Sequence, residues 1–214
     1  MIEIKHLDKA YGEKEVYRDF SFSFRENTVT AILGESGCGK TTLLNILAGL
    51  TPYQAGEVPD LTPLSFIFQT DRLLPHLSVR DNLWFVTGKR ELDDDLRRAG
   101  LYEARDSYIK DISGGQRRRV SILRAFLYPA KTILMDEPFL NIDLKLKREL
   151  MDFYLSYYEG GKRTALFVTH DPDEALYLSA RVVVLKAGRI VFDAENPKNK
   201  PLPREALTNA LING

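Results

Sequence analysis

One nine-residue segment constrains this chain more than any other. "GESGCGKTT" (34–42) follows the short apolar stretch "TVTAIL" and opens a segment with apolar residues at helical spacing. The spacing G-x-x-x-x-G-K-[ST] in that context is typical of a loop that joins a buried strand to a helix and binds nucleotide phosphates. The sequence therefore predicts a buried strand, a tight glycine turn and a helix N-terminus in this order.

The loop offers the groups that a nucleotide's phosphates need. Backbone N–H groups and the partial positive charge of a helix start attract anions, and glycine lets the backbone approach closely. Lys40 can neutralise the β- and γ-phosphates, and the Thr41 hydroxyl can bind Mg²⁺. A purely structural turn would explain the glycines but not Lys40 followed by Thr41. The predicted phosphate-binding residues are Gly34, Glu35, Ser36, Gly37, Cys38, Gly39, Lys40, Thr41 and Thr42.

A second apolar stretch, "TILMDE" (132–137), ends in two acids. Ligands of open α/β sheets bind at the carboxyl ends of the strands, so Asp136 suits Mg²⁺. Glu137 suits a general base that activates water towards the γ-phosphate. The alternative is a solvated acidic turn before Pro138, which explains less when a phosphate loop is present.

The remainder of the chain alternates between strand-like and helix-like patterns. We expect strands near 2–7, 16–24, 28–34, 64–69, 132–137 and 164–170, and a hairpin over 181–193. Helical patterns follow the phosphate loop, residues 113–116 and residue 145, and 71–111 form a smaller, mostly helical lobe. Strands that alternate with helices predict an α/β fold with a mainly parallel sheet.

The composition narrows the classes of partner. The 30 lysines and arginines balance the 30 aspartates and glutamates, which argues against a nucleic-acid binder with a broad basic surface. The single cysteine, Cys38, excludes an internal disulfide and suits a reducing cytoplasm; we interpret it as a small filler residue in the loop. The charged N-terminus is unlike a signal peptide, and no stretch is apolar enough to span a bilayer, so we expect a soluble chain.

A second glycine-rich segment, "SGGQ" (113–116), precedes a helical pattern. Its S-x-x-Q form predicts a capping box, in which Ser113 caps the helix and Gln116 reaches back. The two glycines between them cost backbone conformational entropy on folding. This cost favours a second interpretation, in which the exposed backbone at the helix N-terminus binds an anion. Both interpretations are compatible. We interpret the following "RRR" (117–119) mainly as a solvated face, with an arginine near phosphate as the lesser alternative.

These motifs, in this order, resemble the ATP-binding subunits of ABC transporters over residues 2–193. "SGGQ" is similar to that family's signature motif, with Ile112 where leucine is commoner. The resemblance implies a P-loop nucleotide-hydrolase core with an N-terminal antiparallel β subdomain and a helical subdomain inserted at about 72–128. It also implies that two copies pack head to tail, so that the signature of one copy completes the ATP site of the other. The implied signature contacts are Ser113, Gly114, Gly115 and Gln116.

The resemblance implies further site residues. Tyr11 lies where the family stacks an aromatic ring on adenine, and Gln69 lies where a glutamine contacts Mg²⁺ or the attacking water. His170 matches the histidine that touches the γ-phosphate. Asp143 matches the aspartate that closes the family's D-loop, whereas "LNI" (140–142) departs from the usual Ser-Ala-Leu and puts the small-residue contacts across the dimer in question.

The same resemblance implies a transport role. "FQTDRLLP" (68–75) and "DEPF" (136–139) are similar to the ATPases of nitrate, sulfonate and taurine importers. The implied partners are transmembrane permease subunits, docked on the lobe at 72–110, and a solute-binding protein, with the chain peripheral on the inner face of the cell membrane. An exporter or lipoprotein-release ATPase would share these motifs. A DNA-repair ATPase would need coiled-coil or zinc insertions, and a P-loop kinase or GTPase would leave "SGGQ" unexplained.

Overall fold

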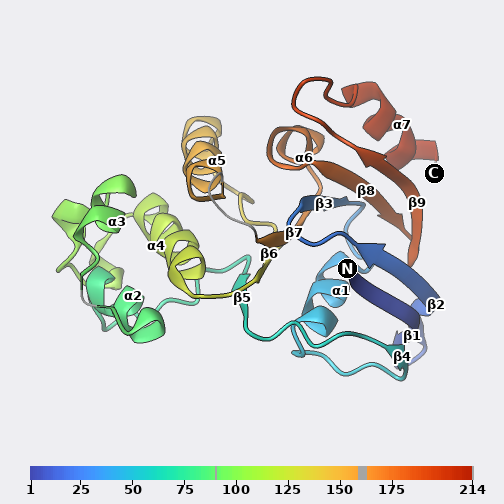
Figure 1. Ribbon diagram of the computed structural model, residues 1–214, viewed down its shortest axis with the longest axis horizontal. Helices are drawn as coiled ribbons and strands as arrows, with labels where there is room; N and C mark the ends of the chain where they lie inside the picture. The colour runs from blue at the N-terminus through green and yellow to red at the C-terminus, as the bar shows by residue number, and fades with distance from the viewer. Residues whose placement is uncertain (90, 159–162, 214) are drawn as a thin grey trace.

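The structure is a computed structural model that describes residues 1–89, 91–158 and 163–213 (Figure 1). The strands are β1 (Ile2–Tyr11), β2 (Lys14–Phe24), β3 (Val29–Leu33), β4 (Ala55–Glu57), β5 (Leu64–Ile67), β6 (Thr132–Asp136), β7 (Thr164–Thr169), β8 (Arg181–Lys186) and β9 (Arg189–Glu195). The helices are α1 (Lys40–Leu47), α2 (Val79–Thr87), α3 (Asp93–Arg98), α4 (Gly114–Leu127), α5 (Leu144–Tyr158), α6 (Pro172–Leu178) and α7 (Arg204–Asn213). Two short 3-10 turns, η1 (Tyr102–Ala104) and η2 (Ile109–Asp111), lie between α3 and α4.

The central sheet has six strands in the order β5-β6-β7-β3-β8-β9. Its first five strands run parallel, and β9 pairs antiparallel with β8 through the predicted hairpin. A smaller antiparallel sheet, β2-β1-β4, packs beside it and carries the N-terminus. The predicted fold class, a P-loop α/β core with an N-terminal antiparallel β subdomain, is confirmed.

Both faces of the parallel sheet are covered, which explains why its strands are continuous apolar runs. Every residue of β3, β6 and β7 is buried. Along β3, Ala31 and Leu33 belong to one core cluster, which also contains residues of α4, α5, α6 and α7. Ile32, between them, belongs to a second cluster with α1, β1 and β2. This period-two alternation determines which of the two core clusters each side chain of the strand joins.

The helical lobe has a hydrophobic core of its own and lies at the far end of the molecule from the antiparallel sheet (Figure 1, green). Val79 and Leu83 from α2, Leu96 from α3 and Val120 from α4 are fully buried in it. Helix α4 belongs to both bodies, because other residues on it pack against the sheet. The boundary at about 72–128 therefore stays a prediction.

Several large apolar side chains lie at the surface. Helix α1 ends at Leu47, and Leu50 beyond it is 56% exposed. In the lobe, Leu74, Trp84 and Phe85 are 39%, 42% and 68% exposed. Across the described residues, no helix combines the length and the apolar character that spanning a membrane would require.

Candidate nucleotide-binding site

The predicted site residues meet at one edge of the parallel sheet. β3, β6 and β7 run side by side in the same direction, with Leu33 paired to Thr169 and Asp136 to Val168. The phosphate loop follows β3, Glu137 follows β6, and His170 follows β7. Three segments that are far apart in sequence therefore converge because carboxyl ends of parallel strands lie together.

Close packing requires the two outer glycines of the loop. A Cβ atom at Gly34 would lie 2.3 Å from the carbonyl oxygen of Leu185. Gly39 has a φ of 114°, and a Cβ there would lie 2.8 Å from the hydroxyl oxygen of Tyr17. That hydroxyl donates a hydrogen bond to the Gly39 carbonyl at 2.9 Å, which fixes the turn into α1. The tight turn expected from the spacing is present.

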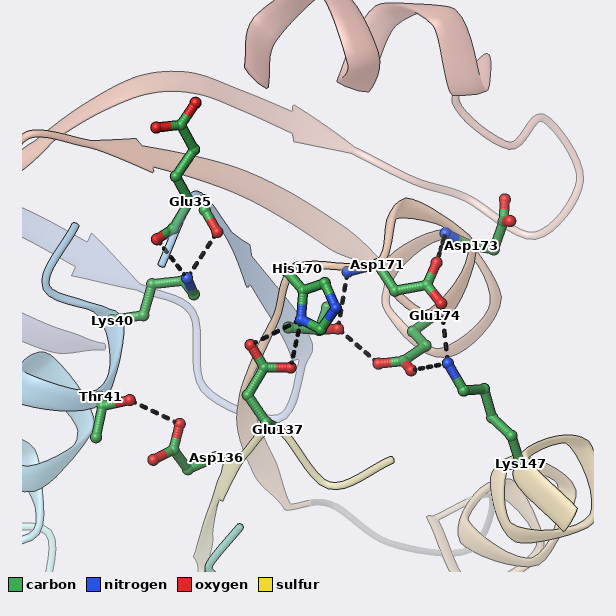
Figure 2. A network of polar contacts seen from close by, with 12 residues as sticks. Glu35, Lys40, Thr41, Asp136, Glu137, Lys147, His170, Asp171, Asp173 and Glu174 are labelled. Carbon is green, nitrogen blue, oxygen red and sulfur yellow. Dashed lines mark hydrogen bonds and ion pairs between the residues drawn. The ribbon is translucent and has the colours of Figure 1, made fainter. Parts of the chain in front are cut away.

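The ammonium group of Lys40 lies inside the curve of the loop (Figure 2). Its Nζ donates to the carbonyl oxygens of Gly34 at 2.6 Å and Glu35 at 2.9 Å. Lys40 is only 6% exposed, so its charge is held against the backbone of the loop. A cation and helix N-terminus in this arrangement favour an anion at the loop.

Thr41 and Asp136 form an oxygen pair suited to a hard divalent cation. The Thr41 hydroxyl donates to Asp136 Oδ1 at 3.0 Å (Figure 2). Burial raises the pKa of the Asp136 carboxyl, although the Thr41 hydrogen bond and the charge of Lys40 oppose the rise. The described residues contain no group of three or more His, Cys, Asp or Glu side chains placed to hold a metal. A cation here fits the pattern of Mg²⁺, which uses few protein ligands together with phosphates.

Glu137 adopts a strained backbone conformation that aims its carboxylate into the site. Its φ is 45°, a region that L-residues rarely adopt, and its N–H donates to the Val168 carbonyl at 3.0 Å. Such strain at a cleft is typical of functional residues. Burial raises the pKa of the Glu137 carboxyl, whereas His170 and Lys40 act to lower it. His170 Nδ1 lies 3.0 Å from Glu137 Oε2.

A second polar network holds the segment after His170 (Figure 2). Lys147 Nζ on α5 contacts Asp171 Oδ2 at 3.0 Å and Glu174 Oε1 at 2.7 Å. The Thr169 hydroxyl donates to Glu174 Oε2 at 2.6 Å. No sequence pattern predicts this network, because nothing in the periodicity of α5 distinguishes Lys147 from its neighbours. It connects the helix after the D-loop to the histidine segment.

A cavity of about 380 Å³ lies in front of the loop. Its lining includes these predicted residues: Tyr11, Ser36, Gly37, Gly39, Lys40, Thr41, Thr42, Gln69, Glu137 and His170. Gly34, Glu35, Cys38 and Asp136 are not among its lining residues. Sequence reasoning missed Lys14, Val16 and Leu140, which also line it. Lys14 was identifiable in principle, because it pairs with Tyr11 across the β1–β2 hairpin.

Tyr11 is half exposed at the end of β1, as an aromatic platform must be. The residue is 50% exposed, and Lys9 Nζ lies 4.3 Å from the centroid of its ring. A flat, accessible ring beside a cation can stack on a base. Gln69, exposed just beyond β5, completes the cavity from the other side.

The signature segment forms the predicted capping box at the start of α4. Ser113 Oγ accepts from the Gln116 N–H at 3.2 Å, and Gln116 Oε1 accepts from the Ser113 N–H at 3.0 Å. Ser113 and Gly114 are exposed. A Cβ at Gly115 would lie 2.9 Å from Leu146 Cδ2, so close packing against α5 is one reason for that glycine.

The signature glycines and the phosphate loop line different cavities. Gly114 and Gly115 line a second cavity of about 290 Å³, together with Asp143. Asp143 also caps α5, because its Oδ1 accepts from the Leu146 N–H at 3.0 Å. Gln69 lines both cavities, so the two lie next to each other along the Gln69 segment.

The expectation of a solvated arginine face on α4 is wrong for Arg118. This side chain is 5% exposed, whereas Arg117 and Arg119 on either side are partly exposed. The sequence could not reveal this burial, because the acceptors of Arg118 come from segments 20 and 50 residues away.

Fold and site together define a P-loop nucleotide-binding protein. The family model described as ABC transporter matches residues 17–140, more than half of the chain. The chain belongs to the ABC transporter family.

Relatives of known role are similar over most of this chain. It is 34% identical to the taurine import ATP-binding protein TauB of Escherichia coli O157:H7, over 88% of this chain and 80% of the relative. It is 34% identical to the aliphatic sulfonates import ATP-binding protein SsuB 1 of Paraburkholderia xenovorans, over 99% of this chain and 65% of the relative. The chain spans only 45% to 60% of the length of three other curated relatives.

A solved structure shares the fold. The ATP-binding cassette MJ0796, in a dimeric post-hydrolysis state bound to ADP and Pi, superposes with a TM-score of 0.78 at 27% identity. The match covers 91% of this chain and 98% of that one.

Proposed function

We propose that this chain binds ATP with Mg²⁺ and hydrolyses it as the ATPase subunit of an ABC transporter that imports a small solute. One observation carries the proposal. A buried lysine in a phosphate loop, a Thr41 hydroxyl bonded to Asp136, a strained Glu137 and His170 meet where three parallel strands end, and all but Asp136 line one cavity. This arrangement positions the reacting groups and supplies charge, which are the main contributions of a protein to phosphoryl transfer.

Each residue has a role in this proposal. Lys40 and the loop N–H groups hold the phosphates, and Thr41 and Asp136 hold Mg²⁺ with Gln69 nearby. When bound, Mg²⁺ neutralises charge that develops on the phosphates. Glu137 accepts a proton from the attacking water, and burial favours this by raising its pKa above that of a free carboxyl.

His170 completes the catalytic group in this proposal. Its ring nitrogen lies within hydrogen-bond reach of Glu137, so it can orient the carboxylate. His170 follows β7, whose end is paired with the end of β3 that precedes the phosphate loop. An imidazole can exchange a proton or donate a hydrogen bond near physiological pH.

The proposed working unit is a head-to-tail dimer. Within one copy, the signature glycines do not line the cavity of the phosphate loop, and Ser113 and Gly114 are exposed. Exposed N–H groups at a capped helix start suit an anion from another chain. MJ0796, which is similar to this chain, is described as dimeric with ADP and Pi. We propose that Ser113, Gly114, Gly115 and Gln116 complete the partner's ATP site, with Asp143 close to it.

Transmembrane permease subunits are the proposed docking partners. An apolar groove of about 300 Å³ lies between the core and the lobe, and its lining includes Leu50, Phe66, Phe68 and Val86. Trp84 and Phe85 on α2 are exposed. A short amphipathic helix of a permease fits such a groove. The chain would then lie on the inner face of the cell membrane.

Import is the direction that the relatives favour. TauB and SsuB 1 are named for import, and both match most of this chain. A solute-binding protein is the further partner expected of such an importer, because the ATPase itself does not select the cargo.

The test is ATP binding and turnover by the purified chain. We expect Mg²⁺-dependent phosphate release, and we expect Lys40→Ala to weaken ATP binding at least about tenfold, because it removes a charge-assisted contact to phosphate. Lys5→Ala is the control, since Lys5 is an exposed lysine of β1 that does not line this cavity. Unchanged binding by Lys40→Ala would remove the phosphate-loop assignment.

A further inference from the structure

Helix α4 begins at the signature and carries a buried cation five residues further on. Arg118 is 5% exposed, on the side of the helix that faces the sheet rather than the solvent. An unpaired buried charge is costly, so such a side chain is kept only where acceptors surround it. Its neighbours therefore show what it does.

The acceptors of Arg118 flank two proposed catalytic residues. Its Nε donates to the Pro138 carbonyl at 2.6 Å, directly after Glu137. Its Nη1 donates to the Phe68 carbonyl at 2.8 Å, directly before Gln69. The same Nη1 donates to Asp71 Oδ1 at 3.1 Å, which balances the charge. One guanidinium thus joins the signature helix to both backbone segments.

The remaining nitrogen of the Arg118 guanidinium is also enclosed. Nη2 is buried and has no hydrogen-bond partner among the described residues, and Arg118 lines the second cavity with Gly114, Gly115 and Gln69. A planar fork can hold two carbonyls in fixed directions, which a single ammonium cannot do. The guanidinium is therefore placed so that a shift of α4 moves the backbone at Gln69 and Glu137.

We propose that Arg118 is a positioning residue that couples the signature helix to Gln69 and Glu137. The proposal rests on the proposed function, since it assigns a role within ATP hydrolysis. When α4 approaches the position it takes during hydrolysis, the guanidinium fixes two carbonyl groups. These are the Phe68 carbonyl, directly before Gln69, and the Pro138 carbonyl, directly after Glu137. Arg118 itself contacts neither nucleotide nor water in this role. A simple structural arginine would stabilise the fold without any separate effect on turnover.

The test compares Arg118→Gln and Arg118→Lys with a matched control. Arg124→Gln removes an arginine from the same helix that also donates to the loop after Gln69. Arg124 donates to the carbonyls of Arg72 and Asp71, and its hydrogen bonds do not include the carbonyls of Phe68 and Pro138. For each full-length chain, kcat, KM, the ATP dissociation constant and the thermal midpoint are measured.

We expect Arg118→Gln to lower kcat at least about tenfold and to leave the ATP affinity within about twofold of wild type. A small displacement of catalytic groups slows the chemical step more than it weakens ATP binding. Arg118→Lys keeps the charge but not the fork, so it should stay folded and recover only a small part of kcat. If Arg118→Gln does not fold, Arg118→Lys carries the test. Arg124→Gln should keep kcat within about twofold.

Three outcomes would overturn the proposal: a wild-type kcat in Arg118→Lys, an equal loss in Arg124→Gln, or a loss of kcat matched by the loss of ATP affinity. A wild-type chain without Mg²⁺-dependent ATP hydrolysis would instead contradict the proposed function. The two failures are therefore distinguishable.

Discussion

The phosphate-loop edge and the signature segment are held in different ways. Lys40 and Asp136 are 6% and 7% exposed, and they follow or end strands whose residues are all buried. Ser113 and Gly114 are exposed, at the start of a helix that packs partly in a separate lobe core. One region is fixed by the sheet, whereas the other is presented to the outside.

The two regions therefore differ in how firmly the fold holds their functional groups. Groups that bind phosphate and Mg²⁺ need fixed geometry, and rigid strand ends supply it. The lobe has a core of its own, but α4 packs in both cores and joins the lobe to the sheet. Arg118 and the pair Arg119–Glu149 are among the polar links between the two bodies.

The largest expected effect tests the chemical side of the comparison. Glu137→Gln should lower phosphate release by about 10²–10³-fold, because it removes a general base. ATP binding should persist, so a nucleotide-bound dimer should accumulate on a sizing column. Glu35→Gln is the control, since the side chain of Glu35 is exposed in the same loop. Normal phosphate release by Glu137→Gln would show that the base assignment is wrong.

A mixing experiment tests whether the two regions act on different copies. Lys40→Ala and Gly114→Asp chains should each be inactive, and an equal mixture should regain up to about a quarter of the wild-type sites by random pairing. Gly114 is a better target than Gly115, because a Cβ at Gly114 meets its nearest neighbour, Arg117, at 3.7 Å, whereas one at Gly115 collides with Leu146. No recovery at any mixing ratio would count against sites shared between copies.

The sheet and the phosphate loop could be predicted because short-range patterns determine them. Apolar runs, the G-x-x-x-x-G-K-T spacing and the S-x-x-Q capping box depend on residues within one turn or strand, and the structure has all of them. The burial of Arg118 depends on Phe68 and Pro138, which lie in other elements. Helical periodicity cannot reveal it, because α4 lies between two bodies and has no single exposed face.

The backbone strain and the ion network were equally hidden from the sequence. A φ of 45° at Glu137 arises where β6 ends against β7, and no residue type marks it. Lys147 meets Asp171 and Glu174 only because α5 and α6 pack side by side. Contacts between elements depend on the tertiary structure, so a sequence pattern within one helix or strand cannot predict them.

A smaller effect separates the loss of folding stability caused by Asp136 from its proposed role in Mg²⁺ binding. Burial raises the pKa of Asp136 above its value in the unfolded chain, so the charged form opposes folding at neutral pH. Asp136→Asn should therefore raise the free energy of unfolding at pH 8 by about 1 kcal/mol while abolishing Mg²⁺-dependent turnover. The gain should shrink as the pH falls below the folded-state pKa, where the wild-type carboxyl becomes protonated in the folded chain, and it should vanish below the unfolded-state pKa. Denaturant unfolding at several pH values checks this, and a loss of stability at pH 8 would contradict it.

The last and smallest effect tests whether Ser113 does more than cap helix α4. Ser113→Ala removes an N-cap and should lower the free energy of unfolding by about 1 kcal/mol. Ser78→Ala is the matched control, because Ser78 caps α2 in the same lobe by accepting from the Asp81 N–H. Both variants should lose similar stability in denaturant unfolding. Only Ser113→Ala should also lower kcat, because only Ser113 is proposed to meet the partner's nucleotide; equal kcat values would leave the signature serine as a cap and nothing more.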